Sequence, residues 1–231
     1  MFEGLLIIVR HADYGGGDES PLSTTGVIQA NQVGEQIRDF LQQNQGTYDA
    51  STVLRIGCTD LRRVIDSLRR MSPRGHMVLL SHFLPEREDT TEEELRVVLD
   101  DIVGYAGHRN AGVVVAVGHG DMPAMLTELI ARNQFDLPDF PQLPGTGTAC
   151  GYLLDLKRRQ IWFVNAYGIS PVDDRGKFEE AKSAEPEQSN PPPFELPGRE
   201  ESAGVEWEPG NLTIFHEDNH SPDVFDDEIP F

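Results

Sequence analysis

Two histidines and a small set of arginines stand at the ends of apolar runs in this 231-residue chain. Arg10 and His11 follow the first run, and His119 follows the most apolar run, which opens directly into a helical pattern. The adjacent pair Arg62 and Arg63 begins the helical pattern after another short run. Because ligands of a parallel sheet collect at the carboxyl ends of its strands, we expect these side chains to meet at one sheet edge.

A cluster of this kind has the groups that phosphoryl transfer needs. A guanidinium group can bind two phosphate oxygens at once through two parallel hydrogen bonds. A neutral imidazole nitrogen can attack phosphorus. A second imidazole, in its protonated form, would stabilise the charge that develops on the transferring group. No third His or Cys has the spacing of a zinc ligand. We therefore expect phosphate chemistry that uses neither a metal nor another cofactor.

The elements that must hold these residues alternate between strands and helices. Continuous apolar runs predict strands, and apolar residues at helical spacing predict helices, with Thr24 or Thr25 capping the first helix. The predicted strands are 5–9, 52–57, 76–81, 111–117, 149–156 and 160–165, and the predicted helices are 24–41, 60–71, 91–105 and 122–132. We expect an α/β fold, a three-layer α/β/α sandwich with a mostly parallel central sheet and an antiparallel hairpin of the last two strands at one end.

Charge and proline divide the chain into unequal parts. Residues 1–169 hold 15 Lys and Arg against 22 Asp and Glu, whereas residues 170–231 hold 4 against 17, together with nine of the 16 prolines. Apolar side chains are too sparse in the second part to offset the entropy lost on ordering the backbone. The sequence therefore predicts a folded domain at 1–169, a disordered acidic Pro-rich linker at 170–222 and a C-terminal peptide motif at 223–231.

The overall composition excludes several function classes. A net charge of −20 argues against direct binding of nucleic acid or of an anionic membrane, because both need clustered Lys and Arg. Two cysteines, Cys58 and Cys150, cannot build a disulfide framework. No apolar stretch approaches 18 residues, and the first ten residues lack the pattern of a signal peptide. We expect a cytoplasmic protein.

Four segments in order resemble the histidine phosphatase (phosphoglycerate mutase-like) superfamily. Leu6–Ala12 is similar to its Arg-His-Gly signature, with Ala in place of Gly, and Ser20–Ala30 to its Pro-Leu-Thr-x-x-Gly-x-x-Gln-Ala segment. Thr59–Arg63 resembles its Ser-Pro-Leu-x-Arg stretch, and Val115–Gly120 resembles the segment with the second histidine. Because the four segments keep the family's order over residues 5–120, chance similarity is a poor explanation.

The resemblance implies a phosphoric monoester hydrolase. In that family the first histidine is the nucleophile and becomes transiently phosphorylated, which implies this role for His11. Arg10, Arg63 and His119 would form the phosphate pocket, and Arg62 is the alternative to Arg63. The implied substrate is a phosphohistidine protein or a small phosphoester.

The family's usual glutamate acid has no unambiguous counterpart. Glu86 is the first candidate, and Glu88 or Asp89 are alternatives. The segment from Leu84 to Asp89 resembles the small phosphohistidine-phosphatase branch, which need not use a glutamate there. The core is also too short for the long insertion with which a mutase shields its intermediate.

Other histidines and one glycine-rich stretch favour plain structural roles. His76, His82 and His108 have no evident partners and are expected to be structural or surface residues. Gly145–Thr148 lacks the Lys of a phosphate loop and precedes a strand rather than a helix. We expect it to be a connecting loop near the pocket.

The C-terminal segment, residues 223–231, has the features of a tethered docking motif. It presents acidic side chains, two apolar anchors and a carboxylate at Phe231, which suit a small apolar pocket with a basic rim. It resembles the tip of bacterial single-stranded-DNA-binding protein, which ends Asp-Asp-Ile-Pro-Phe, although Glu228 interrupts the match. That resemblance implies docking onto DNA replication and repair proteins, and an origin in bacteria or their phages. The residues concerned are Asp226, Asp227, Ile229, Pro230 and Phe231.

Two hypotheses of different classes follow. In the first, the chain is a live phosphatase that the tail delivers to its substrate. In the second, it is a catalytically weak or silent adaptor whose tail recruits partners of the single-stranded-DNA-binding protein or competes for them. An acidic tail kept only for solubility is the simpler alternative to any docking role. The intact Arg10, His11, Arg63 and His119 set favours the live enzyme.

Overall fold

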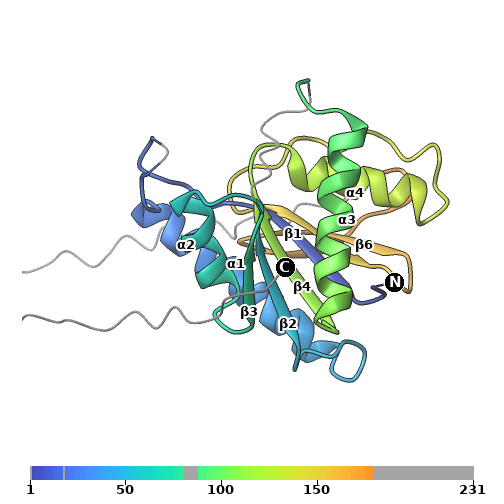
Figure 1. The fold of residues 1–231 in the computed structure, drawn as a ribbon, viewed down its shortest axis with the longest axis horizontal. Coiled ribbons are helices and arrows are strands. Elements are labelled where there is room, and N and C mark those ends of the chain that lie inside the picture. Colours follow the sequence, from blue (N-terminus) through green and yellow to red (C-terminus); the bar gives the residue numbers. More distant parts are fainter. Residues whose placement is uncertain (1, 18, 81–87, 179–231) are drawn as a thin grey trace, which may run out of the picture. The chain divides into compact units, whose positions relative to one another are not determined.

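The computed structural model describes residues 2–17, 19–80 and 88–178 and has the expected α/β class (Figure 1). By its internal contacts the chain divides into two units, Met1–Glu187 and Gln188–Phe231, and the second lies outside the described residues. In chain order the elements are β1 (Leu5–Arg10), α1 (Thr24–Gln43), β2 (Val53–Gly57), α2 (Arg62–Met71), β3 (His76–Leu79), α3 (Glu92–His108), β4 (Val113–Gly118), α4 (Met122–Asn133), β5 (Gly151–Asp155), β6 (Gln160–Asn165) and β7 (Gly168–Pro171).

A single seven-stranded sheet, in the order β3-β2-β4-β1-β5-β6-β7, forms the centre of the described domain. Strands β1 to β4 are parallel, and β5, β6 and β7 continue the sheet as antiparallel neighbours. The central pair β1 and β4 is in a register that places Leu5 beside Val113 and Arg10 beside Gly118. Residues 11 and 119 therefore leave the sheet side by side.

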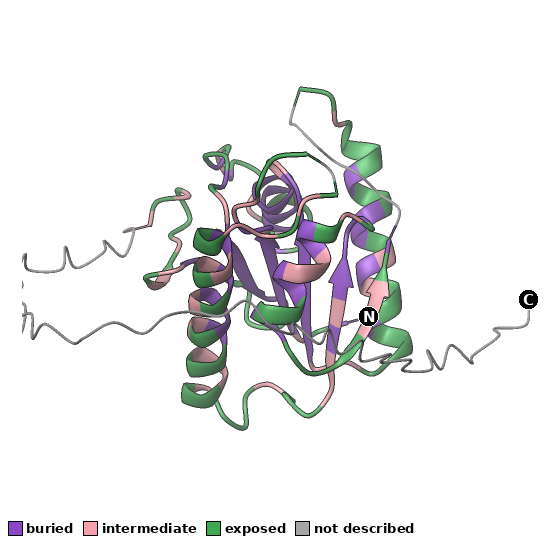
Figure 2. Ribbon diagram, turned by 90° about the vertical axis from the view of Figure 1, so that its left-hand side faces the viewer, coloured by how far each residue is buried: buried purple, intermediate pink, exposed green. Residues whose placement is uncertain are grey.

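Alternating side chains of β1 divide the core between two helical layers. Leu6 and Ile8 pack in the cluster that includes α3 and α4, whereas Leu5, Ile7 and Val9 pack in the cluster that includes α1 and α2. Because strand side chains point to opposite faces in turn, a strand covered on both faces must be apolar where it is covered, as β1 is from Leu5 to Val9. Figure 2 shows the result: the central strands and the helix faces turned toward them are mainly buried, and the outer helix faces are mainly exposed.

The C-terminal side of the sheet differs from the sequence prediction. The predicted antiparallel hairpin is present as β5 and β6, but β7 extends it by a further strand that crosses the expected boundary at residue 169. The chain continues against the core as far as Phe178, whose ring stacks on Phe163 with centroids 4.2 Å apart. Residues 170–178 therefore belong to the folded domain and not to the linker.

The start of α1 also differs from the prediction. Ser23, rather than Thr24 or Thr25, is the N-cap, and its hydroxyl accepts a hydrogen bond of 3.0 Å from the Gly26 N–H. The three adjacent residues all have a hydroxyl group, so their side-chain chemistry alone does not choose among them. Ser23 has the extended backbone of a cap (φ −66°, ψ 168°).

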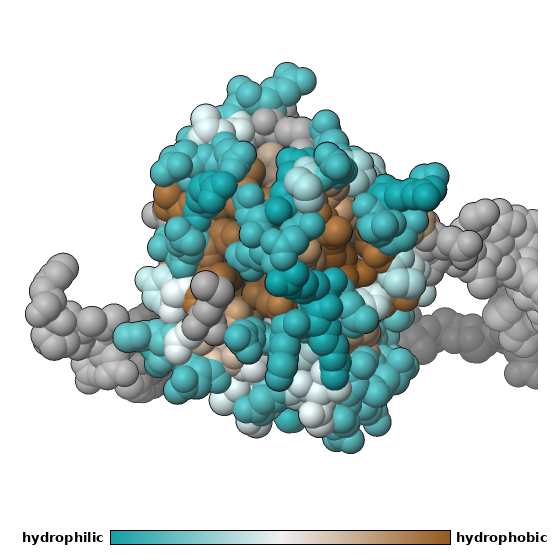
Figure 3. Space-filling view, turned by 90° about the vertical axis from the view of Figure 1, so that its right-hand side faces the viewer, coloured by the Kyte–Doolittle hydropathy of each residue, from teal (hydrophilic) through white to brown (hydrophobic). Residues whose placement is uncertain are grey.

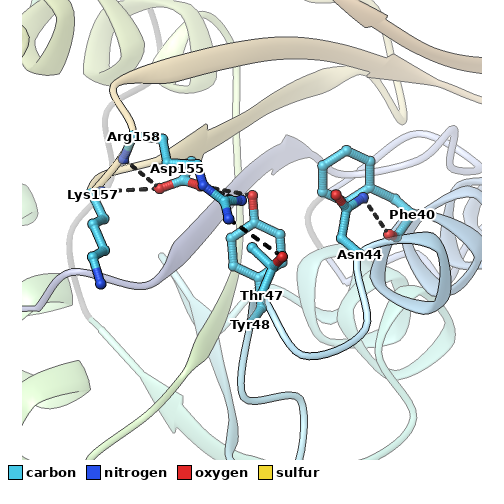
Figure 4. Close-up of polar contacts among 7 residues, drawn as sticks. All are labelled: Phe40, Asn44, Thr47, Tyr48, Asp155, Lys157 and Arg158. Atoms are coloured by element: carbon cyan, nitrogen blue, oxygen red, sulfur yellow. Dashed lines mark hydrogen bonds and ion pairs between the residues drawn. The ribbon is translucent and has the colours of Figure 1, made fainter.

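At the sheet edge opposite the strand ends of Arg10 and Gly118, a polar cluster joins the loop after α1 to the β5–β6 turn (Figure 4). Tyr48 donates a hydrogen bond of 2.8 Å to the buried carboxylate of Asp155, which also accepts from the backbone N–H groups of Lys157 and Arg158. Burial and this hydrogen bond raise the pKa of Tyr48, so its hydroxyl remains a donor. The cluster anchors one end of the domain.

Replacing Tyr48 with phenylalanine removes one donor to Asp155 and should lower the free energy of unfolding by about 1–2 kcal/mol. The expected loss is this large because a buried carboxylate gives up a partner. Chemical denaturation measures it, and Tyr167→Phe, at an exposed tyrosine, is the matched control. Equal stability of the two variants would contradict this role of Tyr48.

One face of the domain is drawn as a space-filling view in Figure 3. On that face, hydrophilic side chains surround smaller areas of hydrophobic ones. Among the described residues, the large hydrophobic side chains that are exposed come from several elements: Ile28, Leu79, Val97, Tyr105 and Tyr167. No described helix is both long enough and apolar enough to cross a bilayer.

Candidate active site

The structure brings the two histidines together at the carboxyl edge of the sheet. The rings of His11 and His119 lie edge to face, with centroids 4.8 Å apart, and both residues are buried. The backbone N–H of His11 donates to the carbonyl of Gly118 over 2.9 Å, which extends the pairing of β1 with β4 by one residue. Parallel pairing of the two most apolar strands therefore accounts for the meeting of the two rings.

A hydrogen bond from one ring nitrogen of His11 to the backbone determines the protonation state of the other ring nitrogen. Nδ1 lies 2.8 Å from the carbonyl oxygen of Ala12. Because a carbonyl oxygen only accepts, Nδ1 must be the protonated nitrogen, and in the neutral ring Nε2 then holds a lone pair. Burial first, and then the nearby charges of Arg63 and Arg10, together lower the pKa of His11 to about 4, against the raising effects of the Ala12 hydrogen bond and of Asp13. At neutral pH His11 therefore presents an unprotonated Nε2, a group that is able to act as a nucleophile.

The second imidazole is also neutral in this environment. Burial lowers the pKa of His119 to about 3, and His11, Arg63 and Arg10 contribute to the same direction. A protonated second imidazole stays a prediction for the site with a phosphoryl group bound. A neutral imidazole still has one N–H donor, and an anion between the rings would raise both pKa values.

Of the two adjacent arginines, Arg63 faces the site and Arg62 faces outward. Arg63 is 5% exposed, and its guanidinium lies over the ring of Tyr14, with Cζ 4.5 Å from the ring centroid. The side chain of Arg62 is 60% exposed and lies 3.6 Å from the carboxylate of Asp66. The helical rotation between neighbours separates the two side chains, so the geometry agrees with the assignment of the pocket arginine to Arg63.

Arg10 is held by the loop that precedes β5. Its Nη1 donates to the carbonyl of Thr146 over 2.7 Å, and the Thr146 hydroxyl donates to the carbonyl of Gly120 over 3.2 Å. The Arg10 Nε is buried without a hydrogen-bond partner among the described residues. Gly145–Thr148 is thus a connecting loop beside the site, as expected from the sequence, and it orients a guanidinium.

Ser67, on α2, links the loop that follows β1 to the backbone of Arg63 on the same helix. The backbone N–H of Ala12 donates to the Ser67 hydroxyl over 2.9 Å, and that hydroxyl donates to the carbonyl of Arg63 over 2.7 Å. Ser67 is fully buried. The position of His11 relative to Arg63 is therefore set by hydrogen bonds as well as by packing.

The second family-like segment supports the same loop from α1. The Ser23 hydroxyl donates to the Asp13 carboxylate over 2.6 Å, and the Asp13 N–H donates to the side-chain carbonyl of Gln29 over 3.1 Å. A Cβ at Gly26 would overlap the Asp13 carbonyl, so this close approach needs glycine. Residues 20–30 hold the site together rather than supplying its chemistry.

Sequence reasoning missed Tyr14. Its ring lies edge to face against His11, with centroids 5.2 Å apart and an interplanar angle of 78°, while Arg63 covers its face. Tyr14 stands in a loop without periodicity, and it falls outside the signature segment that ends at Ala12. No local pattern could have indicated it.

The remaining sequence candidates are either exposed or outside the described residues. Glu86 and His82 lie outside the described residues, as do all five predicted docking residues of the tail. Glu88 and Asp89 are exposed in the turn before α3, and His76 and His108 are exposed. Among the described residues, no group of three or more His, Cys, Asp or Glu side chains could hold a metal ion.

No family model and no curated protein matches this chain. Similar solved structures include SixA from Nakamurella multipartitia, which is assigned as a phosphohistidine phosphatase, at 16% identity and a TM-score of 0.44, over 76% of this chain and 92% of that one. The α-ribazole phosphatase of Shigella flexneri matches at 14% identity and a TM-score of 0.39, over 65% and 90%. The native mycobacterial glucosyl-3-phosphoglycerate phosphatase Rv2419c matches at 16% and 0.40, over 69% and 90%.

Proposed function

We propose that this protein is a metal-independent phosphatase that acts through a phosphohistidine on His11. The observation that carries the proposal is the unprotonated Nε2 of a buried His11 beside His119, Arg10 and Arg63. This combination supplies a nucleophile and phosphate-binding groups in one place.

The reaction takes two displacements at phosphorus. The Nε2 lone pair of His11 forms a P–N bond while the bond from phosphorus to the leaving atom breaks, and that atom takes up a proton. Water then attacks phosphorus, loses a proton, and displaces the imidazole, which recovers its lone pair. Arg10 and Arg63 bind the phosphoryl oxygens, and the N–H of His119 donates to one of them.

The two arginines have a second effect in this proposal. Their charges lower the pKa of His11, which keeps the nucleophile unprotonated before an anion binds. A bound phosphate dianion offsets these charges and raises the pKa of His11, so the two arginines counter protonation of the attacking nitrogen while the phosphoryl group is bound.

For the substrate, we propose a phosphohistidine protein or a small phosphoester. The support is the sequence resemblance to the small phosphohistidine-phosphatase branch. The general acid stays a proposal among Glu86, Glu88 and Asp89, and a good leaving group such as an imidazole or a phenol needs little protonation by the protein.

The first test is hydrolysis of an aryl phosphate in EDTA by the wild type and by His11→Ala. Turnover that is present only in the wild type supports the proposal. Equal turnover in both proteins, or turnover that EDTA removes, would contradict it.

We also propose that residues 223–231 dock onto proteins that bind the tip of the single-stranded-DNA-binding protein. The support is the sequence alone: an acidic segment that ends in Ile229, Pro230 and Phe231. The fold of the described domain carries the catalytic proposal independently.

Deleting Phe231 should remove the capture of such proteins from a bacterial lysate while leaving aryl phosphate hydrolysis unchanged. The reason is that, in this proposal, the Phe231 side chain fills an apolar pocket of the partner. A competing peptide that ends Asp-Asp-Ile-Pro-Phe should displace the same proteins from the full chain. Recovery of identical proteins with and without Phe231 would reject the docking proposal.

A further inference from the structure

Tyr14 connects the two groups on which the proposed reaction depends most. Its ring contacts the His11 imidazole through an edge and the Arg63 guanidinium through a face. The three residues come from different places: the end of β1, the loop that follows it, and the first turn of α2. From the loop that follows β1, Tyr14 therefore contacts both the His11 imidazole and the Arg63 guanidinium.

The backbone of Tyr14 is itself held in place. It forms an isolated antiparallel bridge with Leu22, just before the Ser23 cap of α1. The preceding residue, Asp13, is fixed by Ser23 and Gln29. The ring thus projects from an anchored position, although the loop beyond it, from Gly15, is exposed.

The contact with Arg63 has a physical consequence for anion binding. A guanidinium over an aromatic face is attracted by the ring quadrupole and keeps its planar fork free at the edges. A long arginine side chain without such a contact loses more rotamer entropy when it binds an anion. A guanidinium that is already held in place before the anion arrives therefore binds a phosphoryl group more strongly.

We propose that Tyr14 is a positioning residue, whose ring orients the Arg63 guanidinium and the His11 imidazole toward a common phosphoryl group. The inference rests on the proposed function, because the anion is the phosphoryl group of the substrate. It assigns to Tyr14 no bond to the reacting atoms.

The test uses the full chain and inorganic phosphate as the probe, with calorimetry as the readout. Tyr14→Phe keeps the ring and should bind phosphate within about 2-fold of the wild type, whereas Tyr14→Leu should bind it about 10-fold more weakly. Tyr167→Leu, at an exposed tyrosine, is the matched control and should bind as the wild type does. Tyr14→Met replaces the leucine variant if that variant does not fold.

A second readout separates positioning from a general loss of structure. Among the described residues, the charged groups that shift the pKa of His11 are Arg63, Arg10 and Asp13. If Arg63 moves away in Tyr14→Leu, its positive charge acts less on His11, and the pKa of His11 measured by NMR should rise above about 4. Tyr14→Phe should leave that pKa unchanged.

The outcomes distinguish this inference from the proposed function. Weaker phosphate binding and a raised His11 pKa in Tyr14→Leu alone support the positioning role. Wild-type phosphate binding and an unchanged pKa in Tyr14→Leu would overturn it while leaving the phosphatase proposal intact. A wild-type protein that neither binds phosphate nor hydrolyses an aryl phosphate would overturn both.

Discussion

Replacing His11 with alanine is expected to lower aryl phosphate hydrolysis by at least about 10⁴-fold, because the proposed covalent mechanism loses its nucleophile. The remaining groups could still bind phosphate, so KM for the residual reaction should change far less than kcat. Steady-state kinetics in EDTA measures the effect. His76→Ala, at an exposed histidine of β3, is the matched control and should retain wild-type activity.

The covalent intermediate gives the same prediction a direct readout. Rapid quenching with ³²P-labelled substrate should label the wild type and not His11→Ala, and the label should be stable in alkali and lost in acid, as a P–N bond requires. A label of equal size in both proteins would place the phosphoryl group on another residue.

The pH profile of the wild type follows from the lowered pKa of His11. Protonation of Nε2 inactivates the nucleophile, so kcat/KM should stay high as the pH falls through 6.5 and should decrease only near pH 4, where His11 titrates in the free protein. A decrease centred near 6.5 would mean that water reaches the ring and that burial does not control the nucleophile. Circular dichroism at each pH checks that the domain remains folded.

The second large effect is expected from the adjacent arginines. Arg63→Met should lower kcat/KM by about 10²–10³-fold, because in this proposal the variant loses a buried guanidinium that stabilises the charge of the transferring phosphoryl group. Arg62→Met should change it by less than about 3-fold, because this side chain is exposed and its ion pair with Asp66 is a surface contact. The two variants differ by one position, remove the same charge and keep a similar side-chain volume.

A conservative change sharpens the comparison at position 63. Arg63→Lys keeps the charge but loses the planar fork and its stacking on Tyr14, so it should recover only part of the lost activity. Equal effects of Arg62→Met and Arg63→Met would show that net charge, and not the geometry of Arg63, governs the reaction.

The fold class could be predicted because the strongest strands have unambiguous patterns. The continuous apolar runs of β1 and β4 are typical of strands that are covered on both faces, and the structure pairs them at the centre of the sheet. The weak strand β7 was missed, because Gly168–Pro171 is four residues long, only partly buried and without alternation. Its pairing with β6, rather than any local preference, makes it a strand.

In the candidate site, too, some residues could be predicted from the sequence and others could not. Arg10, His11 and His119 could be placed from the sequence, because residues that follow paired parallel strands must meet at one sheet edge. The choice of Arg63 over Arg62 needed the family resemblance, and the orientation of α2 agrees with it.

The amino-acid sequence by itself determined which side chains gather at the strand ends, since hydrophobic periodicity and parallel pairing are local or nearly local properties. The tertiary structure decided the chemical state of those side chains. The neutral His11 with its free Nε2 depends on burial, on the Ala12 carbonyl and on two guanidiniums from distant elements. Tyr14 joins the site only because the loop after β1 folds onto α2. Desolvation and contacts between distant segments exist only once the chain is packed, and for that reason no sequence pattern could have revealed them.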